Sequence, residues 1–155
     1  MRLWHKDLIE FLPKKQLVAQ LRECVAIASN IYHKGSPKHC LVNPVMKYDA
    51  CEFNSYIKLV IDEFYKRKYK VSEKTLLKLN TYLPSQTVYL NKDKIFKNWH
   101  DAAYLKICFY NLLEKYKCSS ITEDEFEPIL KYYLSQNSIL ERDYILSLSK
   151  GKYYG

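Results

Sequence analysis

Three features are missing from this sequence of 155 residues, and each absence excludes a class of protein. No apolar run reaches about 18–20 residues, the length that a membrane-spanning helix needs. The five cysteines are odd in number and include no C-x-x-C pair, which indicates free thiols in a reducing compartment. The first residues are charged and interrupted by Pro13, unlike a signal peptide. We therefore expect a soluble, cytoplasmic protein with no membrane partner.

Acidic residues are also scarce relative to basic ones, and the formal net charge is +8. Such a charge favours a polyanionic partner, with nucleic acid first and an anionic membrane second. The chain has 15 tyrosines, many of them beside lysines, as in YKRKYK and KYY. Flat rings next to cations suit base stacking and phosphate pairing. An AT-rich coding genome produces the same usage, so composition alone leaves both explanations open.

No internal repeat, low-complexity tract or linker divides the chain, so we predict one domain over residues 1–155. Apolar periodicity predicts an all-α fold with at least four main helices. A short amphipathic segment over 5–12 precedes Pro13, residues 33–51 read as an irregular connection, and 84–98 is ambiguous because TVYL has strand character. Two capping boxes, Thr122 with Glu125 and Ser138 with Glu141, mark the starts of the last two helices. The expected helices cover residues 14–32, 53–70, 72–82, 98–117, 123–135 and 139–149.

The helix over 14–32 separates an apolar face from a polar one. The apolar stripe, at i, i+3, i+4 spacing, consists of Leu17, Val18, Leu21, Cys24, Val25 and Ala28. The opposite face consists of Gln16, Ala19, Glu23, Ala26 and Asn30. Glu23 is thus expected to point away from the core, between two alanines that leave room for a bulky group to approach. An ordinary exposed helix residue is the alternative interpretation of Glu23.

Four stretches of the chain resemble one known family. They are Arg2-Leu3, QLVAQLRE at 16–23, IKLVIDEFYKRKYKV at 57–71 and KYYG at 152–155. On these residues the chain resembles the pyrimidine-dimer DNA glycosylases, the family of the phage ultraviolet-repair endonuclease V. The opening, with LWH at 3–5 and LP-x-x-QL at 12–17, is similar to the bacterial branch of that family. The resemblance covers residues 1–71 and the tail, and is weak between them.

The resemblance implies a compact all-helical glycosylase that is also an abasic-site lyase, with no cofactor and no metal. In that family the N-terminal α-amine attacks C1′ of the damaged nucleotide, and a Schiff base then allows β-elimination. An α-amine with a pKa of about 7.7–8.0 is partly neutral at physiological pH. The resemblance places the assisting carboxylate at Glu23 and the nucleophile at Met1. Loss of Met1 and attack by Arg2 is the alternative, since the family type exposes a threonine.

The resemblance also implies a partner, double-stranded DNA that contains a lesion, bound by a monomer with no obligate protein partner and an activity at the nucleoid. The expected DNA contacts are Arg2, Lys15, Arg22, Lys34, Lys152, Tyr153 and Tyr154. Ala26 stands where the family type has a basic residue one turn after the glutamate, so one phosphate contact is missing or moved. A helical nucleic-acid-binding protein that has lost the chemistry remains the alternative function.

Other residues that bear chemistry have simpler interpretations. Trp4 is expected in the core, and His5 is expected to make a structural hydrogen bond, with a proton shuttle as its alternative. The spacing of His33, His39, Cys40 and Cys51 fits no standard zinc pattern. The acidic run 123–125 suits the first turn of a helix, where it complements the helix dipole. The sequence therefore predicts no metal site.

Overall fold

A computed structural model describes residues 1–85 and 87–152 of the chain. These residues form α-helices and short 3-10 helices and contain no strand, which confirms the predicted all-α fold. The helices are η1 (Lys6–Phe11), α1 (Lys14–Lys34), η2 (Asn43–Lys47), α2 (Ala50–Lys66), α3 (Glu73–Tyr82), η3 (Lys92–Lys94), α4 (Ala102–Lys117), α5 (Glu123–Ser135) and α6 (Ile139–Ser149).

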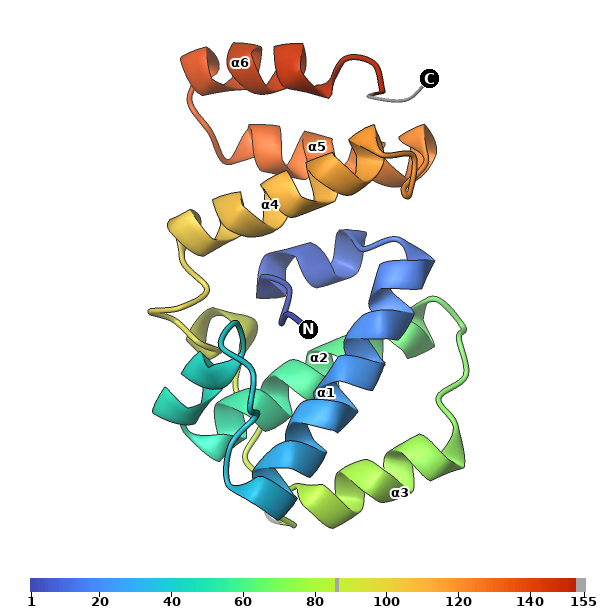
Figure 1. Ribbon diagram of the computed structural model, residues 1–155, viewed down its shortest axis with the longest axis vertical. Helices are drawn as coiled ribbons and strands as arrows, with labels where there is room; N and C mark the ends of the chain where they lie inside the picture. Colours follow the sequence, from blue (N-terminus) through green and yellow to red (C-terminus); the bar gives the residue numbers. More distant parts are fainter. Residues whose placement is uncertain (86, 153–155) are drawn as a thin grey trace.

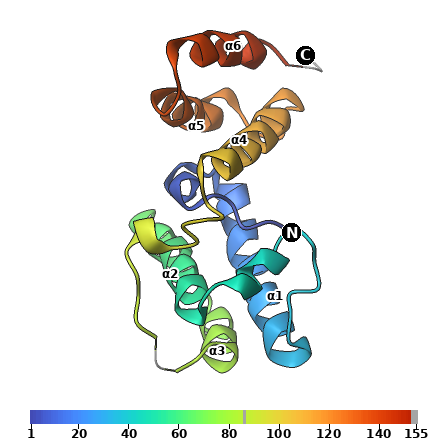
Figure 2. The same cartoon turned by 90° about the vertical axis from the view of Figure 1, so that its left-hand side faces the viewer.

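The helices form two groups with the N-terminal segment between them (Figure 1). One group contains α1, α2 and α3, and the other stacks α4, α5 and α6 in chain order. Residues 1–12 run between α4 on one side and α1 and α2 on the other (Figures 1 and 2). The first residues of the chain are therefore enclosed by helices from both halves of the sequence.

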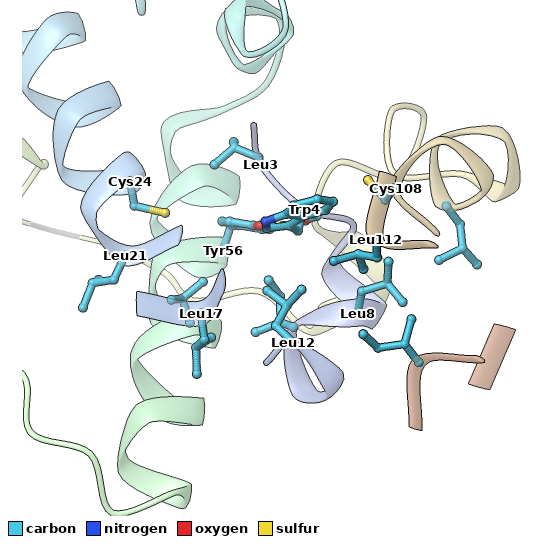
Figure 3. Close-up of a cluster of buried hydrophobic side chains, with 14 of the residues drawn as sticks. Leu3, Trp4, Leu8, Leu12, Leu17, Leu21, Cys24, Tyr56, Cys108 and Leu112 are labelled. Atoms are coloured by element: carbon cyan, nitrogen blue, oxygen red, sulfur yellow. The ribbon is translucent and has the colours of Figure 1, made fainter. Parts of the chain in front are cut away.

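The core follows from this arrangement, because the N-terminal segment supplies apolar side chains to both groups. Leu3, Leu8 and Leu12 are almost fully buried and lie close to Leu17 of α1 and Leu112 of α4 (Figure 3). Each such side chain contributes about 1.5–3 kcal/mol on leaving water. The amino terminus is thus fixed by core packing as well as by hydrogen bonds.

The bounds of several helices follow from local chemistry. Pro13 precedes α1, and Gly35 ends it in the left-handed conformation with φ 71°. Ser72 caps α3 by accepting from the main-chain N–H of Thr75, so this helix begins at Glu73, one residue after the predicted start. The capping box of Thr122 and Glu125 at the start of α5 is present in full.

Other sequence-based bounds were wrong in detail. α2 ends at Lys66 because Arg67 caps it and turns away. α4 begins at Ala102 rather than near Asn98, since Phe96 takes a positive φ of 48° and Asp101 then caps the helix. Ser138 precedes α6 but makes no side-chain cap. The Glu141 carboxylate instead lies 3.5 Å from the ammonium of Lys106, so the second capping box is not formed.

The buried face of α1 is rotated relative to the prediction. Four residues of the predicted apolar stripe are buried: Leu17, Leu21, Cys24 and Ala28. Three residues outside that stripe are buried as well, namely Gln16, Gln20 and Ile27. Val18 and Val25 are only half-buried and line a groove towards α3. Gln16 was predicted to lie on the exposed face of the helix, and this prediction was wrong. The rotation arises because the N-terminal segment covers a face of α1 that an isolated amphipathic helix exposes to water.

Candidate active site at the amino terminus

Hydrogen bonds from α1 hold the first residues in an extended conformation. The main-chain N–H of Arg2 donates to Oε2 of Glu23 over 2.9 Å. The side-chain amide of Gln20 donates to the carbonyl of Arg2 over 3.0 Å and accepts from the N–H of Trp4 over 2.8 Å. Gln20 and Glu23 are three residues apart and so share one side of the helix. Together they align the N-terminal segment along α1.

Two tyrosines fix the same segment from the other helices. The hydroxyl of Tyr56 on α2 donates to the carbonyl of Trp4 over 2.6 Å, and that of Tyr104 on α4 donates to the carbonyl of Leu3 over 2.7 Å. Burial raises the pKa of both hydroxyls, so both remain protonated donors. The three consecutive carbonyls of residues 2–4 are thus each bound by a side chain from a different helix.

The amine of Met1 lies beside Glu23 as a result. Its nitrogen is 3.7 Å from Oε1 of Glu23, while Oε2 of the same carboxylate accepts from the N–H of Arg2. The side chains of Met1 and Glu23 are 22% and 29% exposed. A carboxylate that holds an amine at the surface is able to accept a proton from it, and a substrate is able to reach both groups.

Ala19 and Ala26, on either side of Glu23 along the helix, are half-buried. Their small side chains leave the carboxylate accessible, in agreement with the sequence interpretation. Glu23 itself is half-buried rather than fully exposed. The carboxylate is therefore partly dehydrated and still accessible to solvent.

Gln20 is the central residue that the sequence interpretation missed. It is fully buried and makes contacts with four other residues, including a 3.1 Å contact between its oxygen and the hydroxyl of Tyr56. The sequence contains one signal for this role: Gln20 is three residues after Leu17 and so lies on the apolar side of the helix. A polar side chain buried there is expected to have a hydrogen-bond partner, because buried polar groups are almost always hydrogen-bonded. Periodicity alone gives no partner for it.

The side chain of Arg2 packs on the protein. Its guanidinium lies 5.8 Å from the centre of the Trp4 ring and adjoins Tyr104 and Cys108. Burial raises the pKa of the Cys108 thiol to about 11, and the positive charge of Arg2 opposes that shift. The guanidinium of the half-buried Arg2 is therefore in contact with the protein, and its contact with DNA stays a prediction.

Trp4 and His5 are buried, as expected for residues with structural roles. The His5 ring stacks on that of His100, with 5.2 Å between centroids. Nδ1 of His5 accepts from the N–H of Asp7, and Nδ1 of His100 accepts from the N–H of Lys6. Burial lowers the pKa of His5 and lowers that of His100 to about 2. Both shifts favour the neutral form of the imidazole, in which Nδ1 serves as a hydrogen-bond acceptor.

The predicted DNA contacts on α1 are spread along the helix. Arg22 is exposed next to Glu23. Lys15 and Lys34 are also exposed, but they lie eight residues before and eleven after Glu23, which corresponds to a rise of about 12 Å and 16 Å. Of these three, the structure brings only Arg22 close to the carboxylate.

Lys152, the predicted DNA contact in the described part of the tail, lies against the end of α4. The ammonium of Lys152 donates to the carbonyls of Tyr116 and Ile121 and lies 3.4 Å from the centre of the Tyr116 ring. It thereby ties the tail to the end of α4. Tyr153 and Tyr154 lie outside the described residues.

Residues 1–85 and 87–152 contain neither a metal-binding cluster nor a membrane-spanning helix. No group of three or more His, Cys, Asp or Glu side chains is placed to hold a metal ion there. No helix in this part of the chain is long and apolar enough to cross a membrane.

The structure is that of an all-helical protein in which the terminal amine lies beside a partly exposed carboxylate. Residues 1–77 match the family model for pyrimidine dimer DNA glycosylase, and the chain belongs to this family through that N-terminal part. The match includes α1, α2 and the start of α3, with Met1, Gln20 and Glu23. The family implies glycosylase activity on DNA. Searches of curated proteins and of solved structures found no match.

Proposed function

We propose that this protein is a DNA glycosylase that also cleaves the DNA strand at the resulting abasic site. The observation that supports this most directly is the contact of one carboxylate with two consecutive nitrogens. Glu23 lies 3.7 Å from the amine of Met1 and binds the N–H of Arg2. The amine is thus held in place and has a proton acceptor beside it, which are the two requirements of an amine nucleophile.

The proposed reaction begins with attack of the neutral amine on C1′ of the damaged nucleotide. The new C–N bond forms as the glycosidic bond breaks, and the bonding electrons leave with the base. The amine loses its proton to Glu23, and Glu23 passes this proton to the ring oxygen O4′ as the sugar opens to a protonated Schiff base. The departing base anion takes its proton from water. Removal of a proton from C2′ then expels the 3′ phosphate by β-elimination. The substrate within this proposal is double-stranded DNA with a pyrimidine dimer.

The geometry supports either mature form of the chain. If Met1 remains, its amine is the nucleophile. If Met1 is removed, the nitrogen of Arg2 becomes the terminal amine, and it already lies 2.9 Å from Oε2 of Glu23. Measurement of the intact mass distinguishes the two forms.

Borohydride trapping tests the proposal. The protein is incubated with duplex DNA that contains one abasic site, and the cross-linked peptide is mapped by mass spectrometry. We expect the adduct on the terminal amine, and a trapping rate lower by about 100-fold or more in Glu23→Gln. Glu127→Gln, which removes an exposed carboxylate from α5, is the matched control and should leave the rate unchanged.

A second substrate separates the two activities. Borohydride trapping and strand nicking on ultraviolet-irradiated duplex require the glycosylase step first, whereas the abasic duplex tests only the lyase step. An adduct on an internal lysine, or no adduct while DNA binding is intact, contradicts the proposed mechanism. The latter result supports the alternative, a DNA-binding protein without the chemistry.

A further inference from the structure

A groove lies between α1 and α3, next to the candidate site. The two helices converge at their C-terminal ends (Figure 1), where the rings of Tyr32 and Tyr82 are 5.4 Å apart. The cavity between them measures about 540 Å³. Its walls include Arg22 and Ala26 of α1, the immediate neighbour of Glu23 and the residue one turn after it.

The groove has an apolar floor and a basic rim. Its apolar side chains include Val18, Leu21, Val25, Phe64 and Val71. Its charged side chains are Arg22, Lys70, Lys74 and Lys78, and none of its described lining residues is acidic. Serine, threonine and tyrosine hydroxyls complete the wall. Cations around an apolar strip suit a sugar–phosphate chain, whose sugars pack on the floor while phosphates meet the rim.

The four cations have no acidic partner among the described residues. No ion pair in this part of the chain involves Arg22, Lys70, Lys74 or Lys78, and all four residues are exposed. Lys74 and Lys78 are four residues apart on α3, a spacing at which like charges repel. A bound anion between them relieves that repulsion, so this rim is complementary to a polyanion.

The position of Ala26 gives the groove a specific role. By resemblance, a basic residue is expected here to contact a phosphate, and Ala26 has no charge. Ala26 nevertheless lines the same groove as the lysines of α3. Apart from Arg22, the cations of this groove therefore come from across it: Lys70 precedes α3, and Lys74 and Lys78 lie on α3.

We propose that the groove between α1 and α3 binds one strand of the DNA backbone, with Lys74 and Lys78 supplying the phosphate contacts that Ala26 does not. This inference rests on the proposed function in taking DNA as the polymer. Along α1 the groove runs from Val18 to Ser29, a rise of about 16 Å. Phosphates follow one strand about every 3.4 Å along the duplex axis, so this length accommodates about five of them.

The salt dependence of DNA binding tests the proposal. The observed binding constant is measured from about 50 to 200 mM salt on a duplex with a tetrahydrofuran abasic analogue, which the amine cannot attack. Each phosphate contact contributes about 0.9 to the slope of log K against log salt. We expect the slope of Lys74→Ala/Lys78→Ala to be lower in magnitude by about 1.8, and that of Lys74→Arg/Lys78→Arg to match the wild type.

The matched control is Lys115→Ala/Lys131→Ala, which removes two exposed lysines from α4 and α5. Its slope should change by much less than that of the groove variant. An unchanged slope in the groove variant overturns the proposal, as does an equal change in both double variants, which indicates net charge alone. Binding of poly-glutamate with the same slope, without binding to DNA, also overturns it.

The outcome is distinguishable from that of the proposed chemistry. A reduced slope without a borohydride adduct supports the groove and contradicts the glycosylase mechanism. A normal adduct on the terminal amine with no change in slope supports the mechanism and contradicts the groove.

Discussion

The side-chain oxygen of Gln20 accepts a hydrogen bond from the main-chain nitrogen of Trp4 over 2.8 Å, although sixteen residues separate the two in sequence. The nitrogen of the same amide donates to the carbonyl of Arg2. One buried side chain thus binds a main-chain N–H and a main-chain carbonyl of the segment that begins with the amine. The position of that amine depends on Gln20 as much as on Glu23.

Replacement of Gln20 by leucine is expected to destabilise the fold and displace the amine. It leaves the N–H of Trp4 and the carbonyl of Arg2 without their partner, at a cost of about 3 kcal/mol in the free energy of unfolding. A displacement of about 1 Å lowers the borohydride trapping rate by up to about 100-fold. Urea unfolding and trapping kinetics measure the two effects.

The matched control for this prediction is Gln16→Leu, one turn earlier on α1. Gln16 is also buried, but its side-chain oxygen has no partner in the described structure. Its replacement is expected to change the unfolding free energy by less than about 1 kcal/mol. Equal costs for the two variants would falsify the role assigned to Gln20.

The buried His5 and His100 pair is expected to make stability depend on pH. Burial lowers the pKa of His100 to about 2, and an unfolded histidine has a pKa of about 6.5. Between these values the unfolded chain binds a proton that the folded chain does not. Stability is unaffected by this group above pH 6.5 and is lost below it, by up to about 1.4 kcal/mol per pH unit.

The variant His100→Asn isolates this effect, because asparagine retains an acceptor for the N–H of Lys6 but does not titrate. Urea unfolding at several values between pH 7.5 and 4.5 should give a shallower decline in the variant. His5, whose pKa is also lowered mainly by burial, contributes part of the remaining slope. The prediction is wrong if the two proteins decline in parallel.

Arg67 is expected to be a major stabilising residue outside the site. Its guanidinium donates to Oε1 of Glu63 over 2.7 Å and to the carbonyls of Leu12 and Glu10 over 2.6 and 2.9 Å. It thereby joins the end of α2 to the end of η1. Arg67→Ala removes these bonds and leaves the buried Glu63 poorly paired, at a cost of about 2–3 kcal/mol.

Lys66→Ala provides the comparison for Arg67. Lys66 lies 3.9 Å from the same carboxylate, but its side chain is 69% exposed, so its loss should cost less than about 0.5 kcal/mol. Chemical denaturation of both variants measures the difference. Similar costs would show that Arg67 acts only as a surface charge.

Addition of a charge to the groove is expected to strengthen DNA binding. Ala26→Arg places a guanidinium on the wall that faces Lys74 and Lys78, and each added phosphate contact raises the salt slope by about 0.9. Ser147→Arg adds the same charge on an exposed position of α6 and should leave the slope nearly unchanged. Binding titrations at several salt concentrations decide between local contact and net charge.

Much of the fold was accessible from periodicity and capping residues. The α1 helix, predicted over 14–32 and present over Lys14–Lys34, agrees with the predictions to within two residues, and the capping box at the start of α5 is confirmed. Predictions that depended on a distant partner were less successful. Glu141 was expected to complete a capping box but pairs with Lys106, because a residue on another helix competes for its carboxylate.

The site was accessible only in part. The approach of an amine to Glu23 was expected from the resemblance, and the contact is present at 3.7 Å. The roles of Gln20, Tyr56 and Tyr104 were not foreseen, because each binds a carbonyl in a segment remote in sequence. Gln16 was assigned to the exposed face for the same reason, since periodicity does not show what covers a helix.

The sequence by itself determined the helical class, the basic charge and the helix that presents Glu23, because these depend on local spacing and composition. Only the tertiary structure decided what lies against that helix. The N-terminal segment packs on one face of α1 and directs the amine to Glu23, while α3 packs on another and brings its lysines towards Arg22. Both outcomes depend on contacts between segments far apart in the chain, and these are fixed by burial of apolar side chains rather than by local sequence.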